Sequence, residues 1–96
     1  MASIAGQILE LESERRLLRK ADADIESGRE RLRLQLQLLA TLREAGHNVV
    51  EAERLVNLLG SVLAEWERHR TLIEQRVAYL EKASERAARP PPAKAR

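Results

Sequence analysis

The feature that most constrains this chain is an apolar residue at every seventh position, repeated in two separate segments. The two tracks are Ile4, Leu11, Leu18, Ile25, Leu32 and Leu39, followed by Ala52, Leu59, Trp66, Ile73 and Leu80. A seven-residue spacing places side chains along one narrow stripe of a helix, and such a stripe packs against a partner helix. The tracks therefore predict two long helices that share a seam.

The segment between the tracks predicts a tight turn. Gly46 suits the left-handed backbone conformation that closes a helix, and Asn48 can cap the next helix by accepting a bond from a free backbone N–H. Glu51 follows three residues later, as a capping box requires. We predict a first helix over about 4–45, a turn over 46–48 and a second helix over about 49–88. A loop this short places the helices antiparallel and side by side.

The tracks also predict which residues face each other. In an antiparallel hairpin the numbers of facing residues have a constant sum, and these two tracks pair at a sum of 91 at every step. The predicted pairs are Leu39 with Ala52, Leu32 with Leu59, Ile25 with Trp66, Leu18 with Ile73, and Leu11 with Leu80. Because the tracks were found in different segments, their agreement predicts an all-α antiparallel two-helix hairpin resembling a coiled coil.

Composition favours the same fold, and two alternatives stay open. Ala, Glu, Lys, Leu and Arg make up 60 of the 96 residues, above the roughly 50% typical of coiled coils. Residues 31–38 alternate like a strand, although Leu, Arg and Gln are good helix formers. Ser27 and Gly28 can also split the first helix and give a three-helix bundle, although the seven-residue phase continues unbroken through them.

The sequence predicts specific roles for three positions near the seam. Gly28 lies one turn from Ile25, and we expect its missing side chain to make room for the Trp66 indole, with a hinge as the alternative. Asp22 and His69 also pair at 91, which predicts a polar pair that fixes the register rather than a catalytic or metal site.

A third pair at the sum of 91 joins two like charges. Arg15 would meet Arg76, with Glu12 and Glu14 available to relieve the repulsion. This predicts looser packing at the end of the hairpin that lies away from the turn.

Several apolar residues exceed what one seam needs. They are Leu34, Leu36, Leu38, Val50 and Leu58 near the turn, with Leu17, Leu72 and Tyr79 further along. A lone hairpin would expose them as apolar patches. We expect them to form an interaction surface, on which the chain dimerises into a four-helix bundle or binds a helix of another protein.

The chain shows none of the motifs of common catalytic or cofactor sites. It has no Cys, so disulfides, zinc ribbons and thiol nucleophiles are excluded. Its four glycines are isolated, so no phosphate-binding loop is present. We therefore expect no enzyme activity, cofactor, metal or small-molecule substrate. A recognisable signal peptide and a membrane-length apolar run are also missing, so we expect a cytoplasmic protein without membrane contact.

The net charge of +2 suggests an anionic partner, but it depends on one terminal segment. Residues 89–96 hold three of the 17 basic residues and none of the 15 acidic ones, so the remainder has a net charge of −1. Three consecutive prolines stop a helix, and we expect a disordered Pro-rich tail here. A nucleic-acid-associated protein that uses Arg clusters and this tail is the alternative function.

The stretch Ile25-Glu26-Ser27-Gly28-Arg29, the Gly46-His47 turn and the His69-Arg70 pair carry a resemblance. The chain resembles a group of short bacterial helical proteins of unknown function, over about residues 20–80. The resemblance implies a helical fold and no particular activity. The sequence as a whole predicts a protein–protein interaction or self-assembly module.

Overall fold

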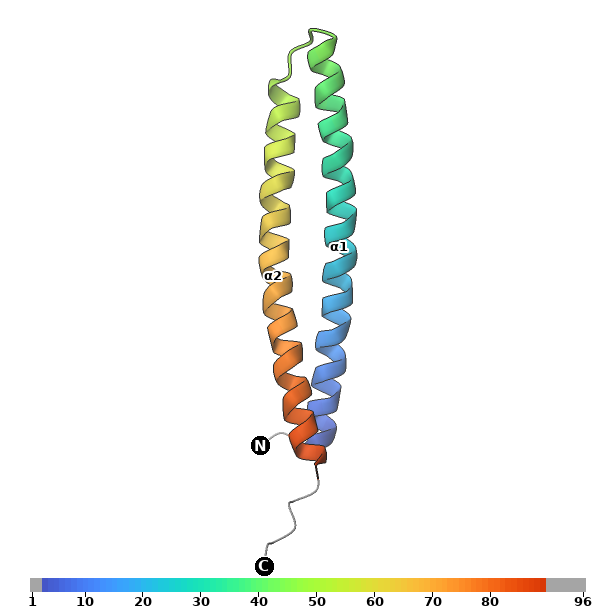
Figure 1. The fold of residues 1–96 in the computed structure, drawn as a ribbon, viewed down its shortest axis with the longest axis vertical. Helices are drawn as coiled ribbons and strands as arrows, with labels where there is room; N and C mark the ends of the chain where they lie inside the picture. Colours follow the sequence, from blue (N-terminus) through green and yellow to red (C-terminus); the bar gives the residue numbers. More distant parts are fainter. Residues whose placement is uncertain (1–2, 90–96) are drawn as a thin grey trace, which may run out of the picture.

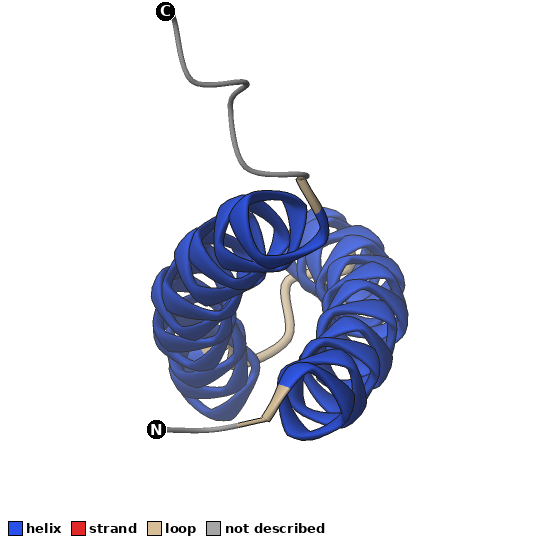
Figure 2. Ribbon diagram, turned by 90° about the horizontal axis from the view of Figure 1, so that it is seen from below, coloured by secondary structure: helices blue, strands red, loops and turns tan. Residues whose placement is uncertain are grey.

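The protein is a hairpin of two long helices. The computed structural model describes residues 3–89, with helix α1 spanning Ile4–Glu44 and helix α2 spanning Val50–Ala88. The helices lie side by side in opposite directions (Figure 1). Seen along their length, they sweep around a shared axis (Figure 2), as helices with a sustained seven-residue repeat do. The predicted all-α hairpin is confirmed. Residues 31–38 are helical, and α1 continues unbroken through Gly28.

The turn confirms two predicted roles and corrects a third. Gly46 has a φ of 73°, and the N–H groups of Gly46 and His47 donate to the carbonyls of Arg43 and Leu42. This pattern is a Schellman motif, which satisfies the last free carbonyls of α1. The Asn48 side chain accepts a bond from a free N–H at the start of α2, that of Val50, at 3.0 Å, as predicted. The predicted capping box is wrong, because this bond goes to the first residue of α2 and not to Glu51.

The carboxylate of Glu51, the other member of that box, accepts from Arg54 at 3.1 Å instead. Val49 holds the cap position of α2 and makes no side-chain capping bond. The helices otherwise begin and end within one residue of the predicted bounds. The predicted tail falls mostly outside the described residues, which end at Arg89.

The seam buries a narrow line of apolar side chains. The buried ones are Leu11, Ile25 and Leu39 from α1, with Leu63, Ile73, Val77 and Leu80 from α2. Leu18, Leu32 and Leu59 are half-buried along the same line. The prediction for Trp66 needs correction, since its side chain is 41% exposed. A second row of α2, which includes Leu63 and Val77, reaches the interior together with the predicted row.

Gly28 explains why that second row reaches the interior. A Cβ atom on Gly28 would lie 2.6 Å from Cδ2 of Leu63 and 3.3 Å from Cζ3 of Trp66. The missing side chain therefore makes room first for Leu63 and only second for the indole. The prediction that this space serves mainly the indole is therefore corrected. Leu63 lies against α1 at the level of Gly28, and the indole turns to the edge of the seam.

The end of the hairpin away from the turn is well packed, contrary to prediction. Leu11, Ile73, Val77 and Leu80 form a buried cluster there, with Leu18 and Ala21 packed against it. The expected repulsion does not arise, because the two arginines point to opposite sides of the seam. Arg76 donates to Glu14 at 3.0 Å and also to Glu10, whereas Arg15 pairs with Glu81 at 3.5 Å.

Two glycine substitutions test this packing. Gly60 is helical, and apart from its neighbours and its own local helix backbone no atom lies within 4 Å of the place a Cβ would take. Gly60→Ala should therefore stabilise the fold by about 1 kcal/mol through helix propensity. Gly28→Ala gains the same propensity but must displace the buried Leu63, at a cost of about 1–3 kcal/mol. Urea unfolding followed by circular dichroism measures both.

The expected result is that Gly28→Ala is less stable than Gly60→Ala by at least about 1 kcal/mol at equal protein concentration. Equal stabilisation by the two alanines would contradict the close contact between Gly28 and Leu63.

Candidate interaction surface

One long face of the hairpin is joined by ion pairs between the helices. Arg15 pairs with Glu81 at 3.5 Å, Arg29 with Glu67 at 2.9 Å, and Arg43 with Glu53 at 3.0 Å. The residue numbers of each pair sum to 96, so all three lie on one side of the seam. We call this side the charged face. Its α1 members stand four positions after members of the apolar track, where charges flank a coiled-coil seam.

Arg70 fills the gap in this series. Its guanidinium donates to Asp22 on α1 and, at 2.9 Å, to Glu74 on its own helix. These hydrogen bonds, the one to Asp22 above all, raise the pKa of Arg70. The predicted pair of Asp22 with His69 is therefore wrong. Asp22 lies on the charged face, and His69 lies on the opposite side of the seam.

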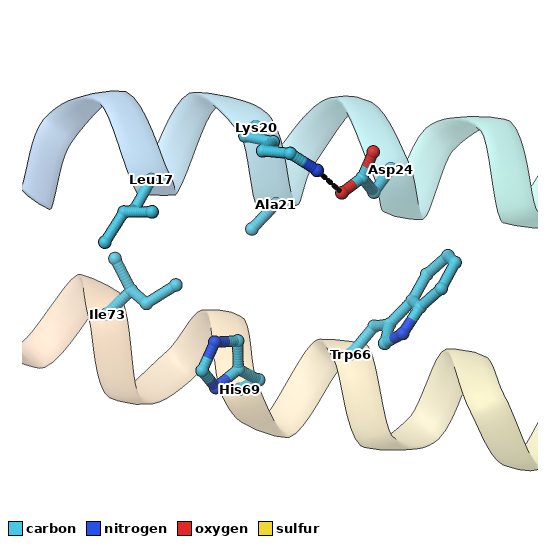
Figure 3. A pocket seen from close by; sticks show the side chains of 7 residues that line it. All are labelled: Leu17, Lys20, Ala21, Asp24, Trp66, His69 and Ile73. Atoms are coloured by element: carbon cyan, nitrogen blue, oxygen red, sulfur yellow. Dashed lines mark hydrogen bonds and ion pairs between the residues drawn. The ribbon is translucent and has the colours of Figure 1, made fainter.

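The opposite side of the seam is hollowed by two grooves. The first is lined by Leu17, Lys20, Ala21 and Asp24 of α1 and by Trp66, His69 and Ile73 of α2 (Figure 3). In Figure 3, Leu17 and Ala21 point toward α2, and the Trp66 ring points toward α1. The second groove is lined by Arg31, Leu34 and Gln35 of α1 and by Leu55 and Leu59 of α2. We call this side the apolar face.

Exposed apolar side chains follow the apolar face along most of its length. Of the eight residues predicted as an interaction surface, Leu17 and Leu34 line the grooves. Helix geometry places four more on the same side, beside the grooves or at the edge of the face: Leu38, Leu58, Leu72 and Tyr79. All six are 47–70% exposed. The other two, Leu36 and Val50, are exposed on the side of the charged face. All eight are thus at the surface, but they do not form one patch.

Sequence reasoning missed two members of the apolar face. Leu55 is 38% exposed and Trp66 is 41% exposed, and each lines a groove. For Leu55 a signal was available, because Leu55, Val62 and His69 repeat every seven residues beside the predicted row. For Trp66 no such signal existed, because its exposure follows from the way Leu63 packs on Gly28.

The clusters of basic residues on α1 are largely paired within the chain. Lys20 binds Asp24 at 2.8 Å, and Arg33 binds Glu30 through two hydrogen bonds that lower the pKa of Glu30. Arg15 and Arg29 belong to the ion pairs of the charged face. These contacts leave fewer cations on α1 for phosphate groups. Within residues 3–89, no three His, Cys, Asp or Glu side chains come together as a metal site would require.

Neither α1 nor α2 is apolar enough over a sufficient length to cross a membrane. Comparison with protein-family models, curated proteins and solved structures gave no match. The chain has the small helical fold that its resemblance to bacterial proteins implied, and no match supports the resemblance beyond that.

Reversing charges tests whether the charged face joins the two helices. Arg29→Glu places two carboxylates together and should lower the free energy of unfolding by about 0.5–1 kcal/mol at low salt. Adding Glu67→Arg restores an opposite pair and should recover most of the loss. Thermal unfolding with and without 1 M NaCl measures both, and the difference should shrink in salt because exposed charges are screened.

A suitable control is Arg68→Glu, because within residues 3–89 Arg68 pairs with Glu65 alone, one turn earlier in the same helix. In that background Glu67→Arg should give no comparable recovery. Recovery in both backgrounds would show that net charge, rather than the contact between helices, controls stability.

Proposed function

We propose that this protein is a non-enzymatic interaction and self-assembly module that acts through its apolar face. In this proposal two copies form a homodimer that packs as a four-helix bundle, in the cytoplasmic setting expected from the sequence. The observation that carries the proposal is the asymmetry of the hairpin. Ion pairs close one flank of the seam, whereas the other flank exposes six large apolar side chains beside two grooves.

The exposed area supports the proposal. The chain exposes 7828 Å², whereas a compact monomer of 96 residues exposes about 5,600 Å². Nine residues lie outside the described range, and even if each is credited with the area of an extended chain, an excess of about 900 Å² remains. A stable interface of standard size buries about 800 Å² on each partner. The hairpin therefore has more surplus surface than such an interface needs.

The type of residue on this surface also favours a protein partner. Large exposed apolar patches mark surfaces that bind proteins or membranes, and Leu, Trp and Tyr give a helix partner contact area without requiring charge. A nucleic-acid partner would need unpaired cations and stacking aromatics, and much of the positive charge on α1 is already paired.

Site-specific photo-crosslinking tests the proposal. A photoreactive amino acid is placed at Leu58, which is 60% exposed on the apolar face, in cells that produce the full chain. We expect one discrete crosslinked product, because the side chain should lie against a partner. The matched control is the same amino acid at Asn57, the neighbouring exposed position on the other side of α2.

The mass of the product identifies the partner as a second copy or as a different protein. Equal crosslinking from both positions, or none from position 58, would contradict a contact role for the apolar face.

A further inference from the structure

The α1 walls of the two grooves have the geometry of coiled-coil holes. Leu17, Lys20, Ala21 and Asp24 are spaced as i, i+3, i+4 and i+7. This is the set of four residues that surrounds an inserted side chain when a second helix packs on the first. In the second groove Arg31, Leu34 and Gln35 stand fourteen positions further on, and the exposed Leu38 completes the same set. The apolar face thus presents two equivalent holes, fourteen residues apart on α1.

Helix α2 presents two exposed side chains at the same spacing. Leu58 is 60% exposed and Leu72 is 63% exposed, and they stand fourteen residues apart in one row of the helix. Each stands three positions after a residue that lines a groove, Leu55 or His69, so both lie at the edge of the apolar face. The first groove has a volume of about 190 Å³. A cavity of roughly 150 Å³ accommodates a benzene ring, so the groove has room for one leucine side chain.

We propose that the partner of the apolar face is a second copy of this chain, with its Leu72 in the first hole and its Leu58 in the second. This inference rests on the proposed function and specifies its partner and its geometry. Each copy gives two leucines and receives two. The α2 helix of each copy then lies along α1 of the other, and the dimer contains four such insertions. The two leucines of one copy are enough to fix the arrangement.

The positions of these residues fix how the copies are oriented. Within one hairpin, residues at the same height have numbers that sum to 91, as Gly28 and Leu63 do. The same test applies between the two copies, if the centre of a hole is taken as the mean number of its four residues. The first hole with Leu72, and the second hole with Leu58, both give a sum close to 91. Two copies can therefore dock without sliding along their length, with both turns at the same end and a two-fold axis parallel to the helices.

Charges favour this parallel arrangement over the reversed one. In the parallel dimer Glu65 of one copy faces Ser27 of the other, about one turn from Arg31. In a dimer with the turns at opposite ends, the same leucines could reach the grooves only from the α2 side. That arrangement places Glu65 against Glu65 of the second copy and leaves about nine residues of each α2 without a partner, or roughly 14 Å at 1.5 Å per residue.

The decisive experiment measures mass and orientation on the full chain. Light scattering should give twice the chain mass, and Leu58→Ala with Leu72→Ala should raise the dimer dissociation constant at least about tenfold, since each substitution removes a docked side chain twice per dimer. The control is Asn57→Ala with Thr71→Ala, two exposed neighbours outside the apolar face, which should leave the constant unchanged.

Orientation is read from a spin label at His47→Cys, which is a unique site because the chain has no native Cys. The two labels should lie about 20 Å apart in the parallel dimer, roughly two helix spacings. In the reversed dimer they would be separated by about the length of a helix, near 60 Å. The label leaves the leucines intact, so this measurement does not depend on the fold of the alanine variants.

Each result has a separate meaning. A dimer with a long label distance would overturn the parallel arrangement. A monomeric wild-type chain would overturn the second copy as the partner, and with it the homodimer of the proposed function. If position 58 were then crosslinked to one different protein, only the contact role of the apolar face would remain. A dimer that is unaffected by the two alanines would contradict both proposals.

Discussion

The structure depends on a single seam between two helices. Each helix can place only one stripe of side chains in that seam, so this long molecule buries only seven apolar residues in the part of the chain that is described. Two flanks of the seam remain beside that stripe, and their chemistry decides how the hairpin behaves. Charged residues that reach across close one flank. On the other flank Arg76 pairs with Glu10 and Glu14 near the chain ends. Toward the turn, the groove on this flank is lined by three leucines together with Arg31 and Gln35.

The height of each residue along the hairpin could be predicted from the sequence, because a turn and a seven-residue repeat leave one register. The side of the seam could not be predicted from that sum alone. Asp22 and His69 lie at the same height, yet one is on the charged face and the other lines a groove. Their positions within the seven-residue repeat differ, and that difference determines the flank. The turn glycine was predictable, since few residue types other than glycine adopt the backbone conformation of Gly46 without strain.

The inner row of α2 was harder to predict, because two rows fit the same register. Ile25 with Trp66 and Gly28 with Leu63 are both pairs that sum to 91. The choice depends on volume, since a glycine opposite a leucine allows the backbones to pack closely, whereas an indole opposite Ile25 needs more space than the seam offers. Packing of this kind depends on the shapes and volumes of the side chains. A pattern of apolar positions gives no information about side-chain volume. The same limit applies to the grooves, whose linings combine residues from both rows and both helices.

Arg70 explains how this hairpin keeps one register although exposed ion pairs contribute little energy each. Arg70 interrupts the inner row of α2, whose other members Val56, Leu63 and Val77 are apolar. Its guanidinium lies between the carboxylates of Asp22 and Glu74, which would otherwise face each other. A slip of seven residues in either direction would bring Leu63 or Val77 to that place and leave Asp22 facing another glutamate without a cation. A polar residue in an inner row costs stability but selects the register. The charged face therefore fixes the alignment of the two helices, and this alignment in turn holds the two holes of α1 level with Leu58 and Leu72 of α2.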